Sequence, residues 1–140
     1  DIDADLSLSR ARFTNADSAG DFIPGSMERV ASLGITYQSG PWTVGSRIRH
    51  FGPRALIEDN SIRGSASTLV NFKAAYRMSP NAELALEVFN LFNRQANDTE
   101  YAYASRLPGE AAFVEGGTRS TLHFHPSLPR TARVGLKFWF

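Results

Sequence analysis

Two histidines near the carboxyl end of the chain have a spacing that could bind a metal ion. The segment "HFH" places His123 and His125 on the same side of an extended chain. Two imidazoles in this arrangement could chelate a metal if Glu110, Glu115 or Asp98 supplied a third ligand. Local hydrogen bonding within a loop is the ordinary alternative. We therefore expect no metal centre and keep the two histidines as candidates.

A second group is suited to a polar organic ligand. The segment "EYAYASR" offers Tyr101, Tyr103 and Arg106, which combine two aromatic faces with a cationic hydrogen-bond donor. Binding sites for small molecules commonly pair aromatic walls with a few polar groups that fix orientation. The alternatives are packing within a loop or an aromatic girdle. We treat the three residues as a candidate ligand-binding group.

The composition excludes several function classes. The chain has 140 residues, a formal net charge of +1 and no cysteine, which rules out disulfides, thiol catalysis and zinc–thiolate sites. We find no nucleophile–base pair, phosphate-binding loop or catalytic pair of carboxylates. Basic residues do alternate with aromatic ones, but at strand spacing and without the excess positive charge of a nucleic-acid binder. We expect neither an enzyme nor a cofactor, and no nucleic-acid partner.

The elements that must position these residues are strands. Apolar residues recur at every second position in six segments: residues 1–9, 29–38, 42–51, 69–78, 82–92 and 130–140. These segments are about twice the usual strand length of ~5–6 residues and match the ~9–11 residues that cross a bilayer at a tilt. Tight connections alternate with long ones, as in outer-membrane barrels. The predicted fold class is all-β, an antiparallel up-and-down meander of about six long strands forming a segment of a large transmembrane β-barrel.

The predicted hairpin of residues 69–92 gives a test of register. If it is centred on Pro80, Arg77 lies opposite Glu83 and Lys73 lies opposite Glu87. All charges that share this side of the predicted strands are expected to face the barrel lumen. They are Arg47, Arg49, Lys73, Arg77, Glu83, Glu87, Arg133 and Lys137. These charges could attract anionic ligands or form a solvated wall that contacts a plug.

The hairpin of residues 29–51 gives a second register. A two-residue turn at Ser39 and Gly40 would place Tyr37 opposite Trp42. Two aromatic side chains would then lie side by side at one rim of the sheet. This is where an interfacial girdle is expected.

The chain ends on an aromatic strand. In "RTARVGLKFWF" the residues Leu136, Phe138 and Phe140 share the apolar side. Soluble domains usually end on polar, frayed residues. This ending is therefore expected to have a role of its own.

Several segments together resemble the carboxy-terminal part of a TonB-dependent outer-membrane receptor. They are "IPGSMERVASLGITYQ", "IRHFGPRALIEDNS", "LEVFNLFNRQANDTEY", "YASRLPGE" and "HFHPSLPRTARVGLKFWF". The resemblance implies a plug domain inside a barrel of ~22 strands, and import of iron chelates or similar scarce ligands with energy relayed by TonB. It also implies that Leu136, Phe138 and Phe140 form the signal read by the barrel-assembly machinery.

The chain departs from that family in extent, because it contains no plug and most of the barrel is missing. We expect residues 1–140 to be the carboxy-terminal portion of the barrel, since six strands alone would leave open edges in lipid. The expected location is the bacterial outer membrane. The expected partners are outer-membrane lipid, the rest of the barrel and plug, the TonB complex, the assembly machinery and a small-molecule ligand. Two alternatives are a small self-standing or porin-like barrel and a soluble β-sandwich binding module.

Overall fold

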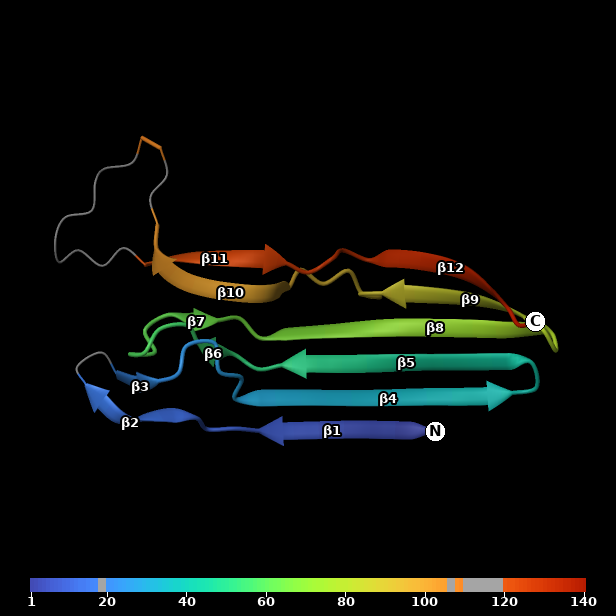
Figure 1. The fold of residues 1–140 in the computed structure, drawn as a ribbon, viewed down its shortest axis with the longest axis horizontal. Coiled ribbons are helices and arrows are strands. Elements are labelled where there is room, and N and C mark those ends of the chain that lie inside the picture. Colours follow the sequence, from blue (N-terminus) through green and yellow to red (C-terminus); the bar gives the residue numbers. More distant parts are fainter. Residues whose placement is uncertain (18–19, 106–107, 110–119) are drawn as a thin grey trace.

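The chain folds into one long antiparallel sheet. The structure, a computed structural model, describes residues 1–17, 20–105, 108–109 and 120–140. Six strands lie side by side in the order of the sequence, with no crossing connection (Figure 1). They are β1 (Ile2–Leu8), β4 (Arg29–Ser39), β5 (Trp42–Phe51), β8 (Ser67–Ser79), β9 (Ala82–Phe89) and β12 (Thr131–Phe138). The predicted all-β meander of long strands is confirmed.

The two ends of the sheet differ. Tight turns join β4 to β5 and β8 to β9 at the end where both chain termini lie, which we call the turn end (Figure 1). The other end, the loop end, carries loop 1 (residues 9–28), loop 2 (residues 52–66) and loop 3 (residues 90–130). Each loop holds a two-stranded sheet that the sequence pattern did not predict. These are β2 (Arg12–Asp17) with β3 (Gly20–Phe22), β6 (Arg54–Ala55) with β7 (Arg63–Gly64), and β10 (Asn97–Ala104) with β11 (Ser120–Pro126).

The six-stranded sheet has an apolar face and a charged face. Strand pairing carries the apolar rows across the whole sheet, so that Leu84 lies between Tyr76 and Leu136. Large side chains on this face are exposed, with Ile2 at 74% and Val134 at 70% of full exposure. A free-standing soluble sheet would leave this surface in water at a large cost. No helix in the described part of the chain is long and apolar enough to cross a membrane.

The hairpin of β8 and β9 has the predicted register. Arg77 pairs with Glu83, and Lys73 pairs with Glu87. A bulge between Arg77 and Ser79 follows at the turn. Opposite charges therefore face each other on one side of the hairpin, as the sequence predicted.

The predicted register of β4 and β5 is wrong by two residues. Trp42 lies opposite Ser39, and Tyr37 lies opposite Val44, because the turn consists of Gly40 and Pro41. Gly40 takes a positive φ of 54°, which suits the first central position of a hairpin turn. An even shift leaves every side chain on its predicted face. The aromatic neighbour of Trp42 is therefore Tyr76 on β8, with ring centroids 4.7 Å apart.

The segment "NLFN" ends β9 and fixes the start of β12. Asn90 and Asn93 both take a positive φ of 50°, which asparagine tolerates better than most residues. The side-chain amide of Asn90 donates to the carbonyls of Arg94 (2.9 Å) and Leu128 (3.1 Å). The Asn93 side-chain oxygen accepts from the backbone N–H of Arg130 at 2.9 Å. These bonds hold both ends of loop 3 together.

Candidate functional site

Ion pairs between strands cover much of the charged face of the sheet. Arg47 on β5 reaches Asp3 on β1 at 2.7 Å, across the intervening strand β4. Gly34 lies between them, and a side chain there would overlap the Asp3 carboxylate. Both charged groups are about half exposed. A pair this exposed adds little stability, ~0–1 kcal/mol, but it sets a local charge pattern on the wall.

A second set of pairs follows β8, β9 and β12. Glu87 lies 3.7 Å from both Lys73 and Arg133, one on each neighbouring strand. Glu83 pairs with Lys137 at 3.6 Å. Strand register thus puts the predicted lumen-facing charges on one face of the sheet, including Arg49 and Arg77.

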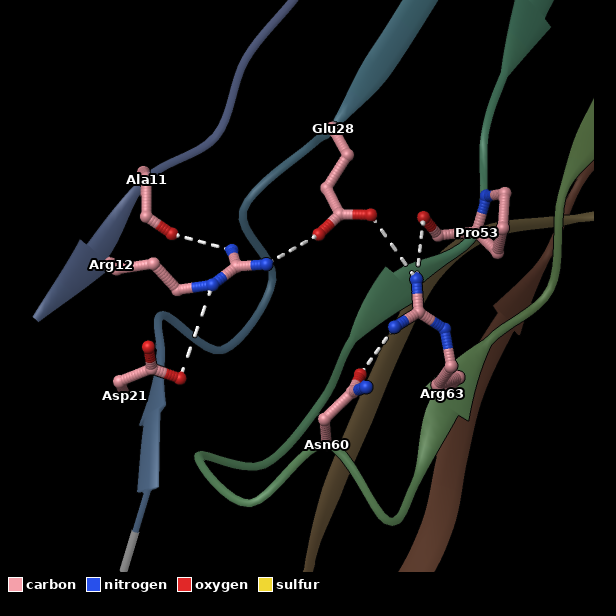
Figure 2. A network of polar contacts seen from close by, with 7 residues as sticks. All are labelled: Ala11, Arg12, Asp21, Glu28, Pro53, Asn60 and Arg63. Atoms are coloured by element: carbon pink, nitrogen blue, oxygen red, sulfur yellow. Dashed lines mark hydrogen bonds and ion pairs between the residues drawn. The ribbon is translucent and has the colours of Figure 1, made fainter.

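At the loop end, Glu28 joins loop 1 to loop 2 (Figure 2). Its two carboxylate oxygens each accept from an arginine, Arg12 at 3.3 Å and Arg63 at 3.3 Å. Arg12 also lies 3.9 Å from Asp21 on β3, and Arg63 bonds Asn60 within its own loop. Each oxygen of the Glu28 carboxylate therefore binds an arginine from a different loop.

This position shifts the ionisation of Glu28. Partial burial by itself would raise the pKa of the carboxyl group. Hydrogen bonds from Arg12 and Arg63, together with their charges, outweigh that effect and leave the pKa of Glu28 below its ordinary value. The carboxylate is thus charged throughout the neutral range.

A buried ion pair joins loop 2 to loop 3. Arg54 on β6 and Glu100 on β10 lie 3.5 Å apart, with side chains only 5% and 1% exposed. Glu100 also accepts from the Ser65 backbone N–H and the Asn97 side-chain amide, both at 2.8 Å. Gly64 leaves the space for its carboxylate, since a side chain there would overlap it. Burying two charges is tolerable only with such additional partners.

A hollow of about 490 Å³ lies between the three loops. Its lining combines apolar side chains from loops 1 and 2 with the charged pair and the aromatic strand β10. The lining residues that matter here are Met27, Leu56, Arg54, Glu100, Tyr101 and Tyr103. A mixed apolar, aromatic and charged lining of this size suits a small polar organic ligand.

The predicted ligand-binding group is partly described. Tyr101 and Tyr103 both line the hollow and are 59% and 54% exposed. Tyr103 also stacks on His123 of β11, with centroids 3.9 Å apart and rings 8° from parallel. Arg106 lies outside the described residues. The structure therefore brings the two tyrosines to one cavity.

The candidate metal ligands are arranged for other contacts. His123 faces Thr121, whose hydroxyl lies 3.1 Å from the imidazole Nε2, and His125 pairs with Thr99 in the β10–β11 hairpin. Within residues 1–17, 20–105, 108–109 and 120–140, no group of three metal-ligating side chains comes together. Glu110 and Glu115 lie outside these ranges.

The carboxy-terminal residues extend the apolar face at the turn end. Leu136 lies opposite Leu84, and Phe138 lies opposite Ala82. Both are more than half exposed, and Phe140 is fully exposed. All three are available to lipid or to another protein.

A single meander with one apolar and one charged face, tight turns at one end and long loops at the other, is the wall of an antiparallel β-barrel of the receptor type. The family model described as "TonB dependent receptor-like, beta-barrel" matches residues 2–91. The chain belongs to this family, as part of its β-barrel.

Solved structures share the fold at low identity. The closed form of the ferric-catecholate import receptor Fiu from K12 E. coli matches 99% of this chain with a TM-score of 0.75 and 20% identity. The copper transporter OprC matches 99% of it with a TM-score of 0.61 and 23% identity. The chain spans only 18% and 21% of those two chains. A search of curated proteins gave no match.

Sequence reasoning missed the charges that join the loops. No sequence motif marks Glu28, Arg63, Arg54 or Glu100 as functional. One available signal is Gly64, which follows Arg63 in the sequence and lies where the Glu100 carboxylate comes close to the backbone.

Proposed function

We propose that residues 1–140 form the carboxy-terminal part of the barrel of an outer-membrane receptor that imports a scarce ligand using energy relayed by TonB. The observation that carries this proposal is the two-faced sheet: an exposed apolar face suits lipid, and a charged face suits a water-filled or plugged lumen. The family assignment of the barrel supports it. In this role the chain contributes wall and loops for transport rather than a catalytic centre.

The sidedness of the sheet assigns its contacts. The apolar face would meet outer-membrane lipid, and the charged face would meet the plug and the lumen. The long loops of such barrels are extracellular. Loops 1 to 3 would then help form the vestibule. The remaining barrel, the plug and the TonB complex are partners of the full-length receptor. At the turn end, Leu136, Phe138 and Phe140 would serve as the signal for the barrel-assembly machinery.

The ligand is best accommodated by the hollow between the loops. Tyr101 and Tyr103 line it, and the proposed ligand-binding group consists of these two tyrosines and Arg106, as expected from the sequence. We propose an iron chelate or similar small chelate as the ligand, because aromatic walls with a few polar groups are typical of sites for small organic molecules. Fiu is a ferric-catecholate import receptor and OprC a copper transporter, so the fold accommodates more than one cargo class.

The proposal is tested by uptake in cells that express the full-length receptor. Changing Tyr101→Ala, Tyr103→Ala and Arg106→Gln together should lower uptake of a radiolabelled iron chelate while folded barrel remains at native levels. Heat-modifiable receptor in purified outer membranes measures assembly. The matched control is Tyr37→Ala, an exposed tyrosine of the apolar face at the turn end. Unchanged uptake by the triple variant would remove the ligand role.

Two alternatives make different predictions from the importer. A self-standing or porin-like barrel would use the same wall without a plug, so its gene would lack a plug-coding region upstream of Asp1. A soluble β-sandwich would need the apolar face covered by a second sheet, and the described residues place the six long strands in one sheet.

A further inference from the structure

The small hairpin β6–β7 in loop 2 carries one arginine on each strand, and the two reach in different directions. Arg63 of β7 bonds Glu28 of loop 1 at 3.3 Å. Arg54 of β6 pairs with Glu100 of loop 3 at 3.5 Å. The strands pair directly, with Arg54 opposite Gly64 and Ala55 opposite Arg63. The hairpin therefore contacts both neighbouring loops, and Figure 2 shows its contact with loop 1 through Arg63 and Glu28.

Backbone contacts strengthen the connection between loops 1 and 2. The Phe22 N–H donates to the Glu58 carbonyl at 3.1 Å, and the Gly25 N–H donates to the Ala55 carbonyl at 2.8 Å. Within loop 2, the Leu56 N–H donates to Ile62 at 2.9 Å. The connection thus combines side-chain ion pairs with main-chain hydrogen bonds, which hold the loops at a defined distance.

The contact with loop 3 is built around a buried ion pair. Arg54 and Glu100 are almost completely buried against each other, so a partial separation would leave two buried charges without their partners. Full separation returns both to water. Partial separation of loops 2 and 3 is therefore unfavourable, which favours a firmly docked arrangement.

We propose that β6–β7 is a clamp that couples loop 1 to loop 3, so that the walls of the hollow between the loops open and close together. Glu28 and Arg63 are positioning residues in this clamp, because they lie outside the described lining of the hollow and act through Arg54 and Glu100. The clamp deepens the proposed function, since it regulates the same hollow and rests on that hollow being the ligand site.

Hydrogen exchange of the full-length receptor in detergent, with no ligand added, tests the clamp itself. Glu100→Gln removes a charge in loop 3, and we expect amide exchange in loop 1, residues 20–28, to accelerate by a factor of about 5 or more, the low end for coupled sites. Arg63→Gln should accelerate exchange in β10 and β11, which Arg63 does not touch. Asp3→Asn, which breaks an ion pair on the wall, is the matched control and should change neither loop.

Acceleration confined to the substituted loop and its direct contacts would overturn the clamp. If Glu100→Gln fails to assemble, Arg63→Gln against Arg63→Lys carries the test, because lysine keeps the charge and should restore most of the protection. Uptake of the iron chelate is measured separately for Arg63→Gln and Arg63→Lys. If Arg63→Gln accelerates exchange in loop 3 but imports the iron chelate normally, the result would count against the hollow as the ligand site. If exchange shows the coupling but neither the native receptor nor the variants import the chelate, the result would count against the transport proposal.

Discussion

Asp3 and Arg47 meet at 2.7 Å although their strands are not neighbours. Strand β4 runs between them, and only the missing side chain of Gly34 lets the two groups approach above it. A pairing across one strand links three strands of the wall with a single contact. The same face continues with Glu87 between Lys73 and Arg133, so the charged face is built from bridges that cross strand boundaries.

Gly34→Ala should break this bridge. The new methyl group would occupy the position of the Asp3 carboxylate, whereas Gly135→Ala on the same face meets open space. Both changes remove a flexible glycine from a strand, which by itself favours the variant by ~0.5–1 kcal/mol. We expect Gly34→Ala to be less stable than Gly135→Ala by ~0.2–1 kcal/mol, the value of an exposed pair. Thermal unfolding of the two folded receptors measures the difference, and equal midpoints would contradict it.

Gly20→Ala should separate loop 1 from loop 2. Gly20 has a φ of 115°, and a side chain there would overlap the backbone of Glu58 and Asp59. Gly25→Ala is the matched control, since Gly25 also has a positive φ, 78°, but has open space around it. Limited proteolysis within residues 20–28 should be faster in Gly20→Ala than in Gly25→Ala. Equal rates would show that backbone strain, rather than the close approach, decides the effect.

The contribution of Glu28 to stability should depend on pH. Because its pKa is lowered in the folded protein, the contribution is present above the unfolded-state pKa of ~4.3 and is lost as pH falls through the folded-state value. Arg12 and Arg63 stay charged throughout this range, and Asp21, 3.9 Å from Arg12, is the other carboxylate of the cluster. The difference in thermal midpoint between the native receptor and Glu28→Gln should be largest near neutral pH and shrink in acid. A difference that grows in acid would give the opposite sign.

The carboxy terminus should act through recognition more than through anchoring. Phe140→Asp in the full-length receptor should lower the amount of folded barrel in outer membranes severely. Lost burial of one Phe accounts for only ~1.5–3 kcal/mol, and an acidic residue near the interface costs little, so a large barrel would tolerate both. Leu136→Asp, deeper in the apolar face, should act through lipid contact instead. Heat-modifiable barrel in purified membranes measures both variants. Near-normal levels for Phe140→Asp would make the aromatic ending an ordinary strand end.

The tyrosines of loop 3 show how far sequence reasoning reached into the candidate site. The sequence presents Tyr101 and Tyr103 as a candidate ligand-binding group in a loop, whereas the structure places both on β10 of the β10–β11 hairpin. The sequence pattern does not predict the β10–β11 hairpin, because a long connection separates its two strands and no short turn signal marks their pairing. The stacking of Tyr103 on His123 follows from that pairing and was equally out of reach.

The sequence by itself determined the six long strands, their order and the face of the residues in them. Side chains alternate along a strand, so the apolar and charged positions can be counted off directly, and a two-residue error in the β4–β5 register left all faces correct. Only the tertiary structure decided how the loops meet. Glu28 and Arg63 are 35 residues apart, as are Ser65 and Glu100, and nothing in a local pattern selects these partners among the many charges of the loops. Their pairing depends on close backbone contacts between the loops, which exist only once the whole chain is folded.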